Sequence, residues 1–145
     1  MSTAPAASGL DYLDLSYRPD LRVLTVRWLR SVSFPELQAG FRQALDMALA
    51  CQAAYWLVDV RRRTEIDAIP STWVAQHLLP EAAAGLAPAT LYVAYLLSPV
   101  RAEQIVTNPA LQAATAQAQA PTQPYRLETF IDEGPAVQWL LSKRQ

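Results

Sequence analysis

The residues best suited to chemistry in this sequence form one short run around Asp59. Arg61, Arg62 and Arg63 stand side by side directly after the apolar stretch 55–60. A guanidinium group presents a planar fork of N–H donors that pairs with a carboxylate or a phosphate through two parallel hydrogen bonds. The run therefore predicts contact with an anionic ligand or an acidic partner surface.

An alternative reading of the same run is structural. One arginine then pairs with Asp59, Glu65 or Asp67, and the other two are solvated. Asp59 ends an otherwise apolar stretch, where an unpaired carboxylate costs free energy. We therefore expect Asp59 at the end of a strand, paired with Arg61 or with a backbone amide.

No catalytic or metal-binding set accompanies this run. His77 is the only histidine and Cys51 the only cysteine, which excludes a multi-histidine zinc site and an intrachain disulfide. We expect both to be structural residues, His77 on the inner edge of a helix and Cys51 buried. Ser71 and Ser98 lack a nucleophile motif, and the four glycines are scattered, so no phosphate-binding loop is expected. We predict no enzymatic activity, no metal and no cofactor.

The totals exclude several classes of partner. A net charge of −1 gives no overall positive field for nucleic acid or an anionic membrane. No apolar run approaches the roughly 18 residues of a membrane span. The single cysteine fits a reducing compartment, so we expect a cytoplasmic protein. The length of 145 residues fits one domain, which we place at 10–145 after a flexible leader at 1–9.

Hydrophobic patterning predicts five strands. The alternating stretches 10–17 and 21–30 are separated by a proline turn and predict an antiparallel hairpin. The continuous apolar runs 54–60 and 91–97 predict strands covered on both faces, and a last strand is expected at 125–131. A helix between 21–30 and 54–60 makes these two strands parallel. The strand at 54–60 is then central, and ligands usually sit at the carboxyl ends of such strands.

About four helices are expected around these strands. Ser33 and Glu36 form a capping box at the start of the first helix. A short helix begins at Ser98, and Asp132 caps the last one. The segment 109–120 is mostly Ala, Gln, Leu and Thr. It offers little apolar surface to bury, and we expect it to be marginal or mobile. The second helix is expected to carry on its inner side Trp73, Val74, His77 and Leu78, with Pro80 interrupting it.

An ordered set of motifs in these elements spans about residues 10–141. The motifs are Leu24-x-Val26-x-Trp28, Ser33-x-x-Glu36-x-x-x-Gly40-Phe41-x-x-Ala44-Leu45, Trp56-Leu57-Val58-Asp59-x-Arg61, Trp73 with Leu79-Pro80, and Phe130 with Ala136-x-x-Trp139-Leu140. With these residues included, the chain resembles the SpoIIAA-like fold, the group labelled STAS/SEC14-type domains of bacteria.

The resemblance implies an α/β domain with a mixed sheet of about five strands that begins with a hairpin. It also implies a non-enzymatic regulatory module that acts by protein contact, with a protein partner or as a homodimer. In anti-sigma-factor antagonists of this fold, a Ser or Thr just beyond the central strand is phosphorylated. This chain departs from that pattern, because arginines occupy 61–63 and the first hydroxyl is that of Thr64. Thr64 is therefore the phosphorylation candidate.

The sequence leaves two functions open. The first is the protein-contact module, and an exposed apolar patch that includes a Trp would favour it. The second is a domain that binds a small anionic or apolar ligand at the C-terminal end of the central strand. The crevice is expected to be lined by Arg61, Thr64, Trp73 and Ser98, and a formed pocket with convergent polar groups would favour this function.

Overall fold

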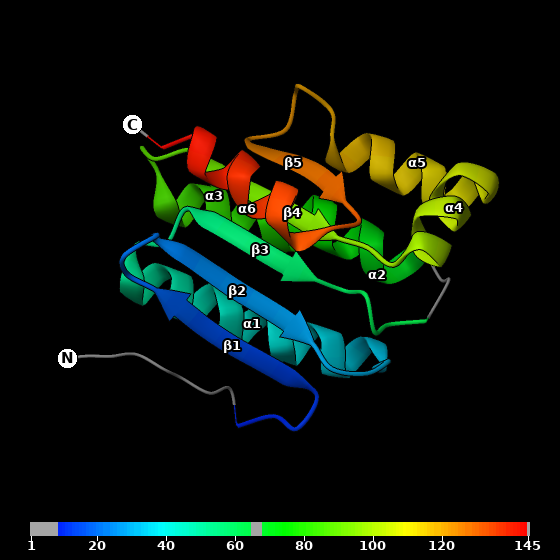
Figure 1. Cartoon of the computed structure of the whole chain (residues 1–145), viewed down its shortest axis with the longest axis horizontal. Helices are drawn as coiled ribbons and strands as arrows, with labels where there is room; N and C mark the ends of the chain where they lie inside the picture. The colour runs from blue at the N-terminus through cyan, green and yellow to red at the C-terminus, as the bar shows by residue number, and fades with distance from the viewer. Residues whose placement is uncertain (1–8, 65–67, 145) are drawn as a thin grey trace.

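The computed structural model describes residues 9–64 and 68–144 and shows an α/β domain with one five-stranded mixed sheet (Figure 1). The strands lie in the order of the sequence. The hairpin pairs β1 (Leu13–Arg18) with β2 (Val23–Trp28) in antiparallel fashion. Parallel to β2 follow β3 (Tyr55–Asp59), β4 (Leu91–Leu96) and β5 (Tyr125–Phe130). The predicted hairpin, the central β3 and the parallel pairing are confirmed.

Two of the expectations concern residues that the structure does not describe. The leader expected at 1–9 lies outside the described residues except for Gly9. Glu65 and Asp67, considered above as partners of the arginines, also lie outside them.

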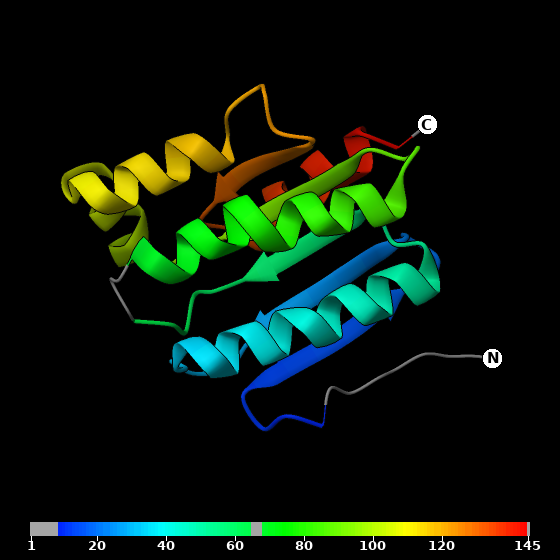
Figure 2. The ribbon, with the colours of Figure 1, turned by 180° about the vertical axis from the view of Figure 1, so that it is seen from behind.

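Helices cover the two faces of the sheet unequally. Figure 2 shows one face with α1 and the continuous α2–η1–α3 helix in front of it, and α5 packs against α2 and η1 on that side. The opposite face carries α6, which contacts β3, β4 and β5 (Figure 1). The helical segments are α1 (Phe34–Cys51), α2 (Ala68–Trp73), the π-helix η1 (Val74–Leu78), α3 (Leu79–Leu86), α4 (Pro99–Thr107), α5 (Pro109–Ala118) and α6 (Glu133–Ser142).

The predicted capping box holds the start of α1. Ser33 Oγ accepts the N–H of Glu36 at 3.2 Å, and the Glu36 carboxylate accepts the N–H of Ser33 at 2.9 Å. Two backbone donors that a helix start leaves open are thus satisfied. This cap fixes the entry of α1 onto the side of the sheet that buries the larger core.

The tryptophans of the predicted motifs divide between core and partial exposure. Trp28 and Trp56 have no exposed surface. The ring of Trp28 packs closely against Gly40 of α1, which has no side chain. A Cβ at Gly40 would lie 2.5 Å from the Trp28 ring. Trp73 and Trp139 are half-buried. None of the four is exposed, so the described residues form no exposed apolar patch that includes a Trp, the feature that would favour the protein-contact module.

The helix after the arginine loop contains a widened turn, η1, just before Pro80. A proline lacks an N–H and therefore interrupts regular α-helical hydrogen bonding. In this turn the N–H of Leu79 donates instead to the carbonyl of Val74, five residues earlier. The helix continues to Leu86, so the expected interruption at Pro80 is wrong. The wider turn also changes the helix face: Val74 and Leu78 are buried, whereas His77 is exposed.

Two further expectations on the helices are corrected. Cys51, expected to be buried, is half-buried, because it lies in the last turn of α1 beside a left-handed cap residue. The segment 109–120, expected to be marginal, contains α5. Its start is capped by Asn108 Oδ1, which accepts two backbone N–H groups at 3.0 and 3.2 Å. Its inner face buries Leu111 and Ala114, so the few apolar residues are concentrated on one side.

The remaining helix starts differ from each other. Ser98 caps α4 by accepting the N–H of Arg101 at 3.1 Å, as a helix beginning there requires. Asp132 occupies the cap position of α6 but its side chain makes no capping hydrogen bond.

Within residues 9–64 and 68–144, no helix combines the length and the apolar character that crossing a membrane requires.

Candidate functional site

The three consecutive arginines after β3 lie in three different environments. Arg61 is exposed in part and belongs to an ion-pair network on the α6 side of the sheet. Arg62 is exposed. Arg63 is only 7% exposed and lines a cavity on the other side of the sheet. The run therefore does not act as one cluster, and each arginine has to be considered by itself.

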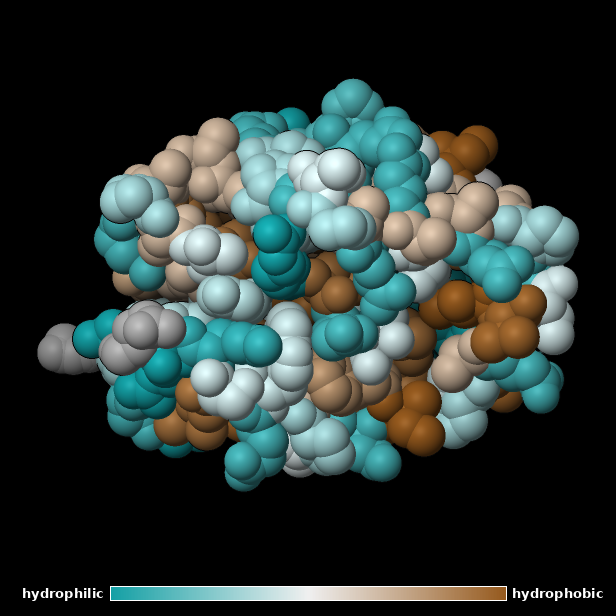
Figure 3. All heavy atoms as spheres, turned by 90° about the horizontal axis from the view of Figure 1, so that it is seen from above, coloured by the Kyte–Doolittle hydropathy of each residue, from teal (hydrophilic) through white to brown (hydrophobic). Residues whose placement is uncertain are grey.

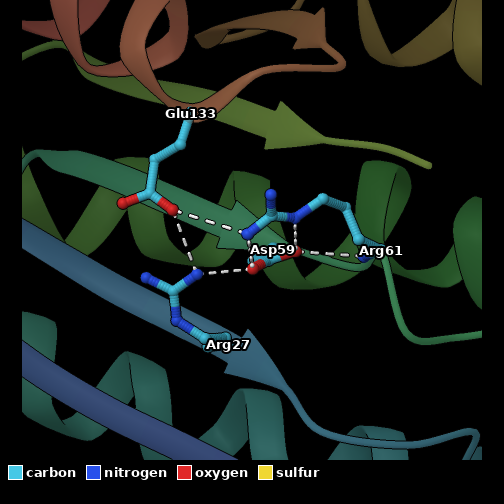
Figure 4. A network of polar contacts seen from close by, with 4 residues as sticks. All are labelled: Arg27, Asp59, Arg61 and Glu133. Atoms are coloured by element: carbon cyan, nitrogen blue, oxygen red, sulfur yellow. Dashed lines mark hydrogen bonds and ion pairs between the residues drawn. The ribbon is translucent and has the colours of Figure 1, made fainter. Parts of the chain in front are cut away.

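Asp59 is the centre of the network (Figure 4). Its side chain is 5% exposed and lies between Arg61 and Arg27, its register partner on β2. The Asp59 carboxylate accepts the backbone N–H, Nε and Nη2 of Arg61 at 3.0, 3.0 and 2.9 Å, together with Nη1 of Arg27. Glu133, at the start of α6, accepts from Arg27 at 3.2 Å and from Arg61 at 3.5 Å.

The network confirms the predicted pairing of Asp59 and adds two members. Arg61 and a backbone amide are its partners, as expected, whereas no sequence pattern points to Arg27 or Glu133. Burial raises the pKa of Asp59, but the hydrogen bonds and charges of Arg61 and Arg27 outweigh it and hold that pKa below its ordinary value. Asp59 is therefore ionised at neutral pH, and its role is to join β2, the loop after β3 and α6.

A cavity of about 60 Å³ lies between the sheet and the helices α2, η1, α4 and α5. We name it the α5 cavity. Its walls are mostly apolar, with Leu79, Leu111 and Leu127 among them. It is formed at the carboxyl-terminal half of β4 and β5, which is where ligands of parallel sheets usually sit.

Two charged side chains and a phenol interrupt the apolar wall. Arg63, from the loop after β3, and Arg101, from the first turn of α4, are 7% and 8% exposed. Tyr95 of β4 is half-buried on the same wall. Burial raises the pKa of Tyr95 to about 12, against the opposing effect of the two nearby guanidinium charges. The Tyr95 hydroxyl is therefore protonated at neutral pH and acts as a hydrogen-bond donor or acceptor.

Local structure positions both arginines. The guanidinium carbon of Arg63 lies 5.8 Å from the centre of the Trp28 ring, within cation–π range. The backbone N–H of Arg101 donates to the hydroxyl of Ser98, three residues earlier.

The widened turn η1 contributes Ala75 to the cavity wall. The carbonyl of Ala75 accepts a hydrogen bond of 2.8 Å from the Tyr125 hydroxyl.

The crevice expected from the sequence is not formed by the residues predicted for it. Arg61 belongs to the Asp59 network, and Thr64 shares a 2.8 Å hydrogen bond with Ser31. Trp73 meets Phe34 edge to face, and Ser98 is a helix cap. None of the four lines the α5 cavity. Each of these side chains is held by a partner near its own element, and none takes part in the cavity wall.

A second, open groove lies between α4 and the loop from β5 to α6. Leu97, Ala102, Phe130 and Ile131 line it, with Asp132 at its rim. Ile131 is 50% exposed and Val100, near the start of α4, is 66% exposed. Figure 3 shows hydrophobic surface gathered at the end of the molecule where α4 lies. This surface carries no exposed Trp.

The described residues contain no group of three or more His, Cys, Asp or Glu side chains placed to hold a metal ion. Comparison of the chain with protein-family models, with curated proteins and with solved structures found no similar protein. What the site could bind therefore has to be argued from its geometry.

Proposed function

We propose that this chain is a STAS-like domain that acts by binding, and that its ligand is a small anion held in the α5 cavity. One observation carries the proposal: two arginines, each more than nine-tenths buried, line the same apolar cavity beside a tyrosine hydroxyl. The site uses Arg63, Arg101 and Tyr95 in place of the crevice expected from the sequence.

Burial of two cations at one cavity has a clear electrostatic consequence. Removing a charge from water is costly unless opposite charge and hydrogen bonds compensate it. A guanidinium carries five N–H donors in a planar fork, which lets one side chain serve more than one acceptor. Two guanidinium groups at one cavity, and the Tyr95 hydroxyl beside them, suit the oxygens of a carboxylate or a phosphate.

The protonation states of the three groups suit the binding of an anion. Tyr95 keeps its proton at neutral pH, and the arginines cannot give theirs up. Such groups hold and orient an anion, and none of them is suited to accept a proton from it.

Support for the STAS-like fold comes from the arrangement of the strands. The sheet begins with a hairpin, and three parallel strands follow in sequence order with α1 and α2–η1–α3 on one face (Figure 2). Motif residues from different elements also contact one another, since Trp28 of β2 lies against Gly40 and Phe41 of α1.

The proposal is tested by isothermal titration calorimetry with sodium acetate and with inorganic phosphate. We expect at least one anion to bind the wild-type protein with a Kd in the range of about 1 mM or tighter. Arg101→Gln is expected to weaken binding at least tenfold, because it removes one buried cation. Arg62→Gln, at an exposed site of the same loop as Arg63, is the matched control and is expected to bind like the wild type.

A second variant keeps the test independent of folding defects. Tyr95→Phe removes only the hydroxyl and is expected to weaken binding several-fold while circular dichroism stays unchanged. The proposal would be overturned if acetate, a longer monocarboxylate such as butyrate, and phosphate all failed to bind the wild-type protein. Equal binding by the wild type and Arg101→Gln would also overturn it.

The open groove favours a second candidate, a protein-contact module that pairs with a second copy of this chain. The observation behind it is that Ile131, which lines this groove, is 50% exposed. Light scattering coupled to size exclusion tests it with Ile131→Lys and with Arg62→Glu. A dimer lost in Ile131→Lys but kept in Arg62→Glu supports contact through the groove, and a monomeric wild type refutes it.

A further inference from the structure

We infer that the anion of the α5 cavity is a monocarboxylic acid with a short apolar tail. The inference rests on the proposed function, because it names the class of anion that the cavity takes. It follows from the way in which polar and apolar groups are distributed along the cavity.

The charged groups and the Tyr95 phenol gather at one level of the sheet, and the cavity wall also holds the hydroxyl groups of Ser71 on α2 and Thr115 on α5. Tyr95 of β4 and Thr129 of β5 are register partners, and both line the cavity. Arg63 and Arg101 come from the loop after β3 and the first turn of α4, which lie beyond the carboxyl ends of the strands. The cationic end of the cavity is therefore the end nearest the carboxyl edge of the sheet.

The apolar groups follow one step further back along the strands. Leu127 precedes Thr129 by two residues on the same face of β5, a distance of about 7 Å along a strand. α5 runs back from the carboxyl edge, so its last turn, with Ala118, lies toward this end. Leu79 completes the same region from α3. None of these side chains can pair with a charge.

This polarity selects the shape of the anion. A carboxylate head reaches Arg63, Arg101 and Tyr95, and a tail then points toward Leu127 and Ala118. A second charged group at the tail would face apolar side chains with the neutral Thr115 hydroxyl as a neighbour and no opposite charge, which is costly. Dicarboxylates and inorganic phosphate, which have no apolar end, therefore fit less well than a monocarboxylate.

The volume limits the length of the tail. The cavity of about 60 Å³ is smaller than the roughly 150 Å³ of an engineered cavity that holds benzene. Ala114 and Ala118 leave the space that larger side chains on α5 would fill. In proportion to the six carbons of benzene, the α5 cavity has room for a tail of about two to three carbons. Each buried CH₂ of this tail strengthens binding about fourfold.

The test compares a set of small molecules by calorimetry on the full chain. Acetate, propionate and butyrate are expected to bind with increasing affinity, about fourfold for each added carbon. Butyramide, which has the tail of butyrate without its charge, is expected to show no binding. Succinate and inorganic phosphate are expected to bind at least tenfold more weakly than butyrate.

A substitution at the tail end provides the structural control. Ala118→Leu places a larger side chain where the tail is expected, so it should abolish the gain from acetate to butyrate. Acetate binding should remain, which also shows that the variant is folded. An unchanged preference for butyrate in Ala118→Leu overturns the orientation that we infer.

The remaining outcomes separate this inference from the proposed function. If acetate or phosphate binds but longer tails bring no gain, the tail assignment is wrong and the anion site stands. If butyramide binds as tightly as butyrate, the carboxylate assignment is wrong. If neither acetate, butyrate nor phosphate binds, both the inference and the proposed function fail.

Discussion

Replacing Asp59 by asparagine tests the ion-pair network that joins β2, the loop after β3 and α6. The amide keeps one oxygen, which can still accept the backbone N–H and Nε of Arg61. It places an NH₂ group where the other carboxylate oxygen accepts from Arg27 Nη1 and Arg61 Nη2. Two charge-assisted hydrogen bonds are lost, and the new NH₂ group faces the N–H groups of Arg27 and Arg61, which are also donors.

The size of the effect follows from these two bonds. Each is worth about 1.5–3 kcal/mol when one partner is removed. The side chains of Arg27 and Arg61 are 27% and 39% exposed, so water replaces part of the loss. We expect Asp59→Asn to lower the free energy of unfolding by about 2–3 kcal/mol at pH 7, and the melting temperature by about 6–9 °C.

The pH dependence of this difference has a fixed sign. The pKa of Asp59 is lower in the folded protein than the ordinary value of 3.8. The carboxylate therefore contributes its full stabilisation above about pH 4, and the contribution is lost as the pH falls through the lower folded-state pKa. The difference between the wild type and Asp59→Asn should be greatest near neutral pH and shrink as the solution is acidified below about pH 4.

Urea unfolding followed by tryptophan fluorescence measures both effects. Asp14→Asn is the matched control, because Asp14 is exposed on β1, and it is expected to change stability by less than about 0.5 kcal/mol. The stabilising role of the network is refuted if Asp59→Asn stays within about 0.5 kcal/mol of the wild type at pH 7. It is also refuted if the difference is the same at pH 7 and in strong acid.

Three further substitutions test other parts of the structure by the same unfolding measurement. Gly40→Ala places a Cβ 2.5 Å from the Trp28 ring and should cost about 1–3 kcal/mol, whereas Gly134→Ala meets nothing within 4 Å and should be tolerated; equal effects would contradict this contrast. Tyr125→Phe removes a buried hydrogen bond and should cost about 1–2 kcal/mol. Because burial raises the pKa of Tyr125 above 10.0, the wild type should lose stability above about pH 10, and Tyr125→Phe should lose less; identical alkaline profiles would contradict it. Asn108→Ala removes the cap of α5 and should cost about 1 kcal/mol; an unchanged midpoint would show that the cap is not needed.

Much of the sheet could be predicted because its signals are local. The alternation in β1 and β2, and the unbroken apolar runs of β3 and β4, are typical of half-buried and fully buried strands respectively. The capping box of α1 is a four-residue motif and is predictable for the same reason. The ion pair between Asp59 and Arg61 was also predictable, since the two residues are only two positions apart at the end of β3.

The remainder depends on contacts between segments distant in the sequence. Arg27 and Glu133 reach Asp59 only because β2 pairs with β3 and α6 begins nearby. His77 lies outside because the widened turn before Pro80 rotates the helix face. No periodicity of a regular helix reveals that turn.

The α5 cavity could not be predicted because its polar groups come from separate elements. Arg63 stands out in the sequence as a member of a run and not as a buried side chain. Tyr95 lies within an apolar strand, and Arg101 follows a helix cap, so each has an ordinary local explanation. One signal was present: Tyr95 precedes the end of β4 by one residue, where the side chains of a parallel sheet approach a ligand.

The most direct test of anion binding is an NMR titration of the wild-type protein with sodium butyrate, following backbone amide shifts. We predict saturable shifts centred on Arg63, Arg101, Ala114 and Thr129, whose side chains line the cavity. In Arg101→Gln the same shifts should need at least tenfold more butyrate to saturate, and in Arg62→Gln they should be retained. Shifts that gather elsewhere, or none up to about 50 mM butyrate (a Kd far weaker than the 1 mM level), would contradict anion binding in the α5 cavity.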